Sequence, residues 1–177
     1  SNIQDEPYAG LPTLAYATLF KAAKKDGIKV LLDGQGMDEQ WAGYDYYQTS
    51  GNSATIQGTG KVNPFRANVL KKDFRQLAEE PVYPTPFDNE LQNLQYRDIF
   101  YTKIPRALRF NDRISMAYST ELREPFLDYR MVEFAFSQPK EYKISNGVQK
   151  FLIREILKEM APKDLSYAPK RPLQTPQ

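Results

Sequence analysis

The sequence contains neither cysteine nor histidine among its 177 residues. The absence of cysteine excludes disulfides, thiolate metal sites and a thiol nucleophile. The absence of histidine removes the commonest general base and the commonest side-chain ligand of transition metals. Any catalysis by this chain must therefore use carboxylates, lysine, arginine, tyrosine or the backbone.

Strong net charge and long apolar runs are lacking as well. The 24 basic and 22 acidic residues leave a net charge of +2, too small for a field that would gather nucleic acid or anionic lipid. No apolar run approaches the roughly 20 residues that span a bilayer, and the N-terminus lacks the basic-then-apolar order of a secretory signal. We therefore expect no nucleic-acid partner, no membrane association and a cytoplasmic location.

The composition indicates a globular chain, and the length suits one domain. Residues 1–2, Ser-Asn, are typical of the remnant that tag removal leaves, and the chain stops in a polar, proline-rich stretch. We therefore expect a fragment in which residues 3–177 are part of a larger domain. Such a fragment would lack part of its active site.

The first ordered elements are predicted to be a helix and a short strand. The helix begins near Pro12 and ends in the basic turn Lys24-Lys25, just before Gly27. Residues 28–32 are apolar and rich in β-branched side chains, which predicts a buried strand. This order is typical of α/β folds with parallel sheets. The helical positions expected to face the core are Ala15, Leu19, Ala22 and Ala23.

The rest of the chain is predicted to be mainly helical. The polar segment from Gly51 to Gly60 predicts a loop and a candidate lid. Asp128 can cap a helix, Asn146-Gly147 predicts a turn, and the prolines after Pro162 predict extended structure. The helices are expected at 67–80, at 90–103, from a break at Pro105 to 118, at 128–138 and at 150–160.

A glycine-rich turn follows the predicted strand, in the run Asp33-Gly34-Gln35-Gly36-Met37-Asp38-Glu39. Glycines let backbone N–H groups approach a phosphate closely, and a carboxylate one turn further on can hold Mg²⁺. A structural explanation is equally open, in which the glycines permit a tight turn and the acids suit a helix start. The residues alone do not separate the two.

Four blocks of the chain resemble the asparagine synthetase family, in the family's own order. The glycine-rich run resembles a strand that ends in Ser/Asp-Gly-x-Gly-x-Asp-Glu and is followed by Gly-Tyr, here Gly43-Tyr44. The other blocks are Asp5-Glu6-Pro7, then Asn111–Ala117 with Glu121–Asp128, and finally Lys150–Arg154.

The resemblance implies a fold and an activity. The fold would be a mainly helical fragment with a short buried strand, part of an α/β adenine-nucleotide-α-hydrolase-like (PP-loop ATP pyrophosphatase) synthetase domain. In the family a carboxylate, here aspartate or a related acid, attacks the α-phosphate of ATP, and glutamine-derived ammonia then displaces AMP to form an amide. The resemblance therefore implies ATP and Mg²⁺ as cofactors and small molecules as substrates. Whether the full-length protein forms a homodimer stays open.

The resemblance also implies residue roles. Asp38 would be the magnesium ligand, and the turn residues Gly34, Gln35 and Gly36 would line the nucleotide and acyl-phosphate region, with Gln35 also a catalytic residue. Lys150 would be the catalytic cation, and Arg154, four residues further on the same helix face, would meet pyrophosphate with it. The alternative for these two cations is a solvated basic face.

Several departures from the family pattern are present. Many members have an acid where this chain has Gln35, which cannot accept a proton, and an apolar pair where it has Gln40-Trp41. The family's Ser-Gly-Gly-x-Asp-Ser pyrophosphate loop and N-terminal cysteine do not occur in this sequence. We therefore expect the fragment alone to be inactive. Two other hypotheses stay open: a paralogue that amidates another carboxylate, and a non-catalytic module that retains the scaffold.

Clustered charges and aromatics are expected to be structural. The charged residues around 125–127 predict a buried ion-pair network. The aromatics after the glycine-rich turn could stack on adenine, but clustered aromatics more often form a core, which we favour. The charged set is Arg113, Glu121, Arg123, Glu124 and Asp128, and the aromatic set is Trp41, Tyr44, Tyr46 and Tyr47.

Overall fold

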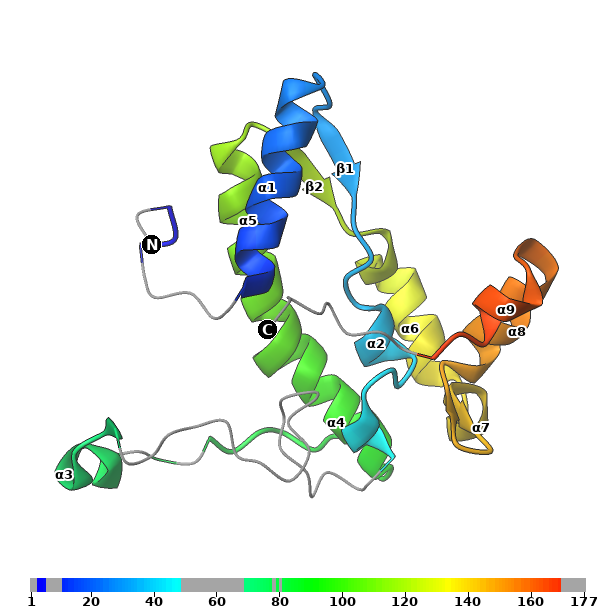
Figure 1. The fold of residues 1–177 in the computed structure, drawn as a ribbon. Coiled ribbons are helices and arrows are strands. Elements are labelled where there is room, and N and C mark those ends of the chain that lie inside the picture. Colours follow the sequence, from blue (N-terminus) through cyan, green and yellow to red (C-terminus); the bar gives the residue numbers. More distant parts are fainter. Residues whose placement is uncertain (1–2, 6–10, 49–68, 78, 80, 170–177) are drawn as a thin grey trace.

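The molecule is mainly helical, with two short pairs of strands (Figure 1). The computed structural model describes residues 3–5, 11–48, 69–77, 79 and 81–169, so the expected tag remnant and the 51–60 loop lie outside it. None of the helices in those ranges is long and apolar enough to cross a membrane. The elements are α1 Leu11–Lys25, β1 Val30–Leu32, α2 Met37–Gln40, η1 Asp45–Tyr47, α3 Lys72–Gln76, α4 Glu90–Arg97, η3 Asp98–Thr102, α5 Lys103–Ala117, β2 Glu121–Arg123, η4 Pro125–Leu127, α6 Tyr129–Ser137, α7 Lys140–Lys143, β3 Ile144–Ser145, β4 Val148–Gln149, α8 Phe151–Met160 and α9 Lys163–Ser166.

The strands β1 and β2 form a parallel pair beside the helices α1 and α5 (Figure 1). Leu31 pairs with Leu122, and the backbone N–H of Asp33 donates to the carbonyl of Arg123 at 2.9 Å. Because parallel strands end at the same edge, the segments that follow β1 and β2 leave the pair side by side. That edge is where ligands bind in open α/β sheets.

The predicted strand is present, but it is shorter and less buried than expected. It covers Val30–Leu32, and the Leu32 side chain is 72% exposed. In the described part of the chain β1 pairs with β2 alone, so no strand pairs with its other edge there. The helix α1 has the predicted bounds, but Phe20 and Ala23 are buried while Leu19 is exposed, so the expected apolar stripe is only partly correct.

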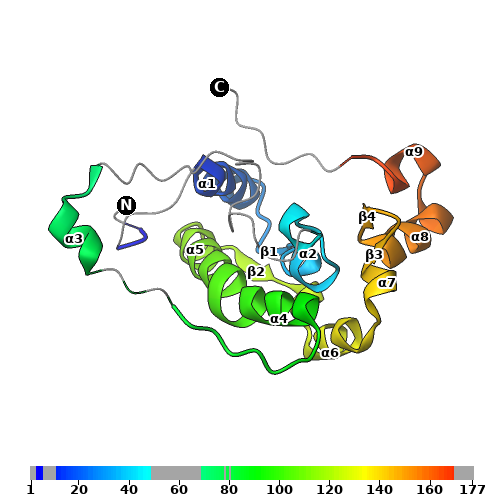
Figure 2. The same ribbon diagram turned by 90° about the horizontal axis from the view of Figure 1, so that it is seen from below.

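A continuous helical rod runs from α4 through η3 into α5 (Figures 1 and 2). The irregularity predicted at Pro105 occurs just before it, as the π-helical segment η3. Pro105 lies in the first turn of α5. In a regular helix its ring would crowd the carbonyl four residues earlier, and proline has no N–H to donate to that carbonyl. The backbone hydrogen bonds therefore change from the α-helical to the π-helical pattern immediately before the proline.

The C-terminal third agrees with the sequence in two of its features. The Asp128 carboxylate accepts from the Arg130 N–H at 2.9 Å and caps α6, as predicted. The predicted turn at Asn146-Gly147 has both residues at positive φ, at 50° and 76°, and joins β3 to β4 in a hairpin. The hairpin itself was not among the predicted elements.

Three predictions for helix boundaries need correction. The helix expected at 150–160 begins at Phe151, with Lys150 before it in the left-handed conformation at a φ of 54°. A one-turn helix, α9, follows Pro162 where extended structure was expected, because proline is tolerated at a helix start. Of the helix expected at 67–80, the described residues contain only the five of α3.

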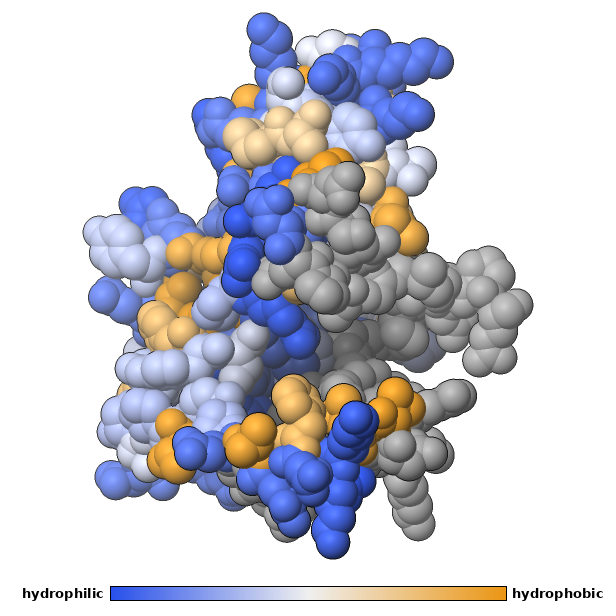
Figure 3. All heavy atoms as spheres, turned by 90° about the vertical axis from the view of Figure 1, so that its left-hand side faces the viewer, coloured by the Kyte–Doolittle hydropathy of each residue, from blue (hydrophilic) through white to orange (hydrophobic). Residues whose placement is uncertain are grey.

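The segment around α3 stands apart from the other elements in both ribbon views (Figures 1 and 2). Phe74 and Leu77 are exposed there. From the α3 side of the molecule, hydrophobic residues form separate groups among hydrophilic ones (Figure 3). This segment contributes no residue to the site described below.

The predicted buried ion-pair network is absent from the described residues. Arg123 instead pairs with Glu121 at 2.8 Å on the exposed strand β2, because alternate strand residues share a face. Arg113 pairs with Asp5 near the surface, and Asp128 pairs with the exposed Arg130. Glu124 makes no ion pair among these charges, and both its carboxylate oxygens are buried without a hydrogen-bond partner.

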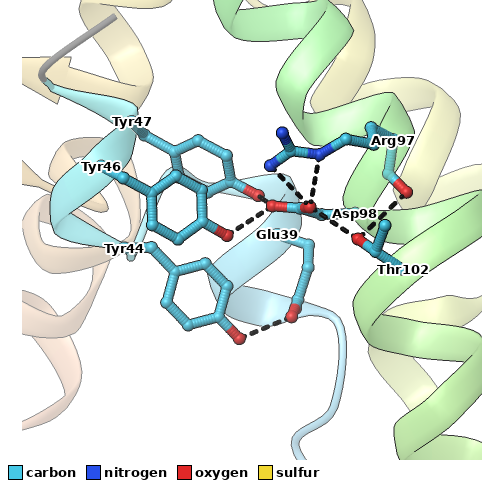
Figure 4. A network of polar contacts seen from close by, with 7 residues as sticks. All are labelled: Glu39, Tyr44, Tyr46, Tyr47, Arg97, Asp98 and Thr102. Carbon is cyan, nitrogen blue, oxygen red and sulfur yellow. Dashed lines mark hydrogen bonds and ion pairs between the residues drawn. The ribbon is translucent and has the colours of Figure 1, made fainter. Parts of the chain in front are cut away.

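A buried network around Asp98 connects the segment after α2 to the helical rod (Figure 4). The fully buried Asp98 carboxylate accepts from the hydroxyls of Tyr46 and Tyr47, and it also accepts from Thr102 at 2.8 Å and pairs with Arg97 at 3.0 Å. Burial, followed by the Asp98 charge, raises the pKa of both tyrosines, so they remain donors. The aromatic cluster is therefore core, as favoured: Trp41, Tyr46 and Tyr47 are buried, and Tyr44 is partly buried.

We predict that Asp98→Ala destabilises the chain by about 3 kcal/mol or more, because the buried donors around it lose their acceptor. Urea unfolding can be followed by the fluorescence of Trp41, the single and buried tryptophan. The exposed Asp45→Ala in η1 is the matched control and should change stability by less than about 0.5 kcal/mol. Equal effects of the two substitutions would contradict the importance of this network.

Candidate functional site

The turn that follows β1 is shaped by a side-chain cap and one obligatory glycine. The Asp33 carboxylate accepts from the Gly34 N–H at 2.6 Å and from the Asn111 amide at 3.4 Å. Gly36 has a φ of 94°, and a Cβ there would collide with the side chain of Leu127. Gly34 has neither restriction, since a Cβ there would contact nothing.

Asp38 and Lys150, far apart in the sequence, form an ion pair at the end of this turn. The Lys150 Nζ lies 2.5 Å from Asp38 Oδ1, and both side chains are about a quarter exposed, at 25% and 26%. The Lys150 N–H also donates to the Trp41 carbonyl at 3.2 Å, which anchors the start of α8 beside α2. A solvated basic face is therefore not what the structure shows at Lys150.

Gly43 makes this pairing sterically possible. Its N–H donates to the Asp38 carbonyl at 2.7 Å. A Cβ at this position would occupy the space of the Asp38 carboxylate and of Lys150 Cε. In the sequence Gly43 is visible only as part of the Gly-Tyr pair of the family motif, with no role assigned to it. Its spacing from Asp38 is the feature that could have indicated this close contact.

A cavity of about 330 Å³ opens beside this pair, between α2 and the helices α8 and α9. Lys150 and Arg154 both line it, so the predicted shared face is partly correct. The Arg154 guanidinium, however, donates to the carbonyls of Gln149 at 2.9 Å, Ser166 at 2.9 Å and Ala168 at 3.1 Å. These bonds hold the α9 segment against α8, and pyrophosphate binding by Arg154 stays a prediction.

Glu39, the second acid of the turn, is structural. It is 2% exposed and accepts from the Tyr44 hydroxyl at 2.6 Å. Burial raises the pKa of Glu39, and burial followed by the Glu39 charge raises the pKa of Tyr44. The two neighbouring acids thus differ: Asp38 pairs with Lys150, which lines the cavity, and Glu39 lies in the core.

Polar side chains fix the end of α2. The buried Gln95 amide donates to the carbonyls of Glu39 and Gln40, at 2.6 Å each, and accepts from Lys143 at 2.8 Å. Lys143 is itself buried, and this burial lowers its pKa to about 8. Gln40, which departs from the family pattern, donates to the Phe126 carbonyl at 2.5 Å. These bonds fix the last two residues of the helix that carries Asp38.

Comparison with known proteins decides the family. The family described as "Asparagine synthase" matches residues 1–177. The chain belongs to the asparagine synthase family. It is 28% identical to "Asparagine synthetase [glutamine-hydrolyzing] 3" of Bacillus subtilis, over 84% of this chain and 26% of that protein. It is 32% identical to a putative asparagine synthetase of Methanocaldococcus jannaschii, over 70% and 17% respectively, and 29% identical to human asparagine synthetase, over 80% and 19%.

The chain spans about a quarter or less of these asparagine synthetases. Asparagine synthase domains use ATP, and the family implies an adenine-nucleotide-α-hydrolase-like fold. The mainly helical structure with short strands agrees with a fragment of such a domain. Of the predicted site residues, Asp38 and Lys150 meet directly, and Gly34, Gln35 and Gly36 lie in the turn that leads to them.

The site of this asparagine synthase fragment fits a magnesium ion bound with phosphate. No group of three or more acidic or other metal-ligating side chains occurs in the described ranges. Magnesium needs only one or two carboxylates when substrate phosphates and water complete its shell. Asp38 supplies one carboxylate beside Lys150. One carboxylate is sufficient when phosphate and water complete the shell, but not for a site made of protein ligands alone.

The sequence predicted that Glu124 belongs to an ion-pair network. In the structure it follows the carboxyl end of β2 and lies beside the glycine-rich turn after β1, near Asp33 and Gln35. Burial and then the charge of Asp33 raise the pKa of Glu124 to about 7, and hydrogen bonding from the Gln35 backbone opposes this rise. Glu124 also lines a hollow of about 630 Å³, together with Leu32, Leu127 and other residues. Its position opposite Asp33 follows from the strand register, which the sequence did not reveal.

We predict that Gly43→Ala destabilises the chain by about 1–3 kcal/mol, because the new methyl group displaces the Asp38 carboxylate and the Lys150 stem. Gly34→Ala is the matched control in the same segment and should stay within about 0.5 kcal/mol. Urea unfolding of both variants measures this. A Gly43→Ala chain as stable as the Gly34→Ala chain would contradict the packing described.

Proposed function

We propose that this chain is the later part of a synthetase domain that converts a carboxylate to its amide with ATP. The carboxylate, aspartate in the leading case, attacks the α-phosphate of ATP and forms an acyl-adenylate. Ammonia derived from glutamine then displaces AMP and yields asparagine. The observation that carries this proposal is the contact of Asp38 with Lys150 at the cavity beside the glycine turn.

The two charges have complementary parts in this chemistry. Lys150 would offset charge on the pyrophosphate leaving group, since an ammonium that is already positioned acts strongly in a partly buried site. Asp38 would hold Mg²⁺, which neutralises phosphate charge when bound. Gly34, Gln35 and Gly36 would let the backbone approach the nucleotide. Without ligands the two charges neutralise each other, which explains why both can lie partly buried.

We propose further that residues 3–177 are the C-terminal portion of this domain. The edge of β1 that has no strand partner among the described residues supports this. Parallel strands are usually paired and buried on both faces, whereas β1 ends in the exposed apolar side chain of Leu32. Preceding parts of the protein would then supply further strands of a PP-loop ATP pyrophosphatase sheet, the pyrophosphate loop and the glutaminase. The substrates would be small molecules, and the location cytoplasmic.

Gln35 favours one second candidate, a paralogue that amidates another carboxylate. Its amide can donate hydrogen bonds to an acceptor acid, which a carboxylate cannot do.

We predict that Gln35→Glu in the full-length protein changes the relative rates with different carboxylate substrates. The substitution removes a hydrogen-bond donor and adds a negative charge next to the substrate that accepts the amide nitrogen. Pyrophosphate release with a panel of acids measures this. An unchanged profile would contradict a role for Gln35 in acceptor choice.

For the full-length protein we predict that Asp38→Ala and Lys150→Ala each reduce ATP- and aspartate-dependent pyrophosphate release by about 10²-fold or more, because each removes charge stabilisation from the transition state. Lys158→Ala is the control, since this lysine lies on the same helix but pairs with Glu155 at the surface. It should retain full activity. Rates near wild type in either site variant would contradict the assignment.

A further inference from the structure

The Glu124 carboxyl is buried at the carboxyl end of the strand pair and pairs with no side chain of the described residues. Neither oxygen forms a hydrogen bond of ordinary geometry, although the backbone N–H of Gln35 lies close enough to lower the carboxyl pKa. Such groups are rare in folded proteins, and each calls for an explanation such as a catalytic role. Glu124 directly follows β2, while Asp33-Gly34-Gln35 directly follows β1, so the parallel register brings the acid to the turn where Gln35 lies.

The polar groups next to Glu124 are less suited than Glu124 itself to accept a proton. Gln35 has no basic atom. Both oxygens of Asp33 already accept, one from Gly34 and one from Asn111. The pKa of Tyr16, on α1, is raised by its burial and by Asp33, so this phenol keeps its proton. Of the two carboxyls that follow the strands, Glu124 is the one whose oxygens form no hydrogen bond of ordinary geometry.

We propose that Glu124 is the general base of the amide-forming step and supplies the proton acceptor that Gln35 cannot provide. This rests on the proposed function. The nitrogen of ammonia forms a bond to the acyl carbon, and the bond from that carbon to the phosphate oxygen breaks, so that AMP leaves with the electron pair. One proton passes from the nitrogen to the Glu124 carboxylate, and two remain on the amide.

The surroundings of Glu124 suit this task near neutral pH. The charged and titratable groups around it are Asp33 after β1, Tyr16 on α1, and Arg123, which pairs with Glu121 on β2 itself. The hollow that Glu124 lines also contains Asp128 and Arg130, which pair with each other. With a pKa of about 7, the deprotonated form increases as the pH rises through neutrality. The rate of amide formation should rise over the same range.

The test uses the full-length protein with ATP, aspartate and ammonium chloride, and follows pyrophosphate release in a single turnover and amide formation separately. For Glu124→Gln we expect pyrophosphate release within about twofold of wild type and amide formation reduced about 10²-fold or more. The rise of amide formation near pH 7 should disappear. The double variant Gln35→Glu/Glu124→Gln restores a carboxylate at the turn and should recover amide formation.

Two controls separate this proposal from folding and from the proposed function. Glu121→Gln, on the same strand but exposed and paired with Arg123, should leave both steps unchanged. If Glu124→Gln lowers both steps equally and the double variant recovers neither, Glu124 is structural and the proposal is overturned. Unchanged amide formation and pH profile in Glu124→Gln would also overturn it. A wild-type protein that releases no pyrophosphate with any carboxylate would instead overturn the proposed function.

Discussion

The buried carboxylate of Asp98 is the interaction on which the arrangement of this chain depends. It lies where the helical rod changes from α to π geometry, and it accepts from two tyrosines that follow the glycine turn. A buried charge is costly unless several donors surround it, so the tyrosines and the rod must meet in one relative position. That position sets the path of the segment after α2, and with it the place of Asp38. The network is therefore structural, but the site is built on it (Figure 4).

Polar contacts rather than apolar packing position the site itself. The helix α2 has only one turn, too short to be stable alone. Gln95 of α4 donates to the carbonyls of Glu39 and Gln40 and accepts from Lys143 of α7, and Gln40 itself donates to the Phe126 carbonyl in η4. Directional bonds specify orientation more tightly than apolar contact does, and proposed catalysis by Asp38 requires that precision. The departure Gln40 thus has a structural explanation.

The acids near the glycine turn illustrate how environment separates residues of the same type. Asp38 pairs with a lysine that lines a cavity, Glu39 is buried under a tyrosine hydroxyl, and Glu124 is buried with no side-chain partner. These three surroundings suit a metal ligand, a core acceptor and a proton acceptor respectively. A base directly after the second strand would leave Gln35 to serve the acceptor substrate, which accounts for the departure at Gln35.

The sequence alone was enough to identify the family, the helix α1, the cap at Asp128, the turn at Asn146-Gly147 and the aromatic core. Each of these depends on neighbouring residues or on a short motif, and local chemistry is readable in order along the chain. The contact of Asp38 with Lys150, the need for Gly43 and the position of Glu124 were decided by tertiary structure. They depend on strand register and on distant segments meeting, which no local pattern records. The strand itself was predicted correctly, but its burial and the ion-pair network were not, because burial depends on what covers a segment and not on its own composition.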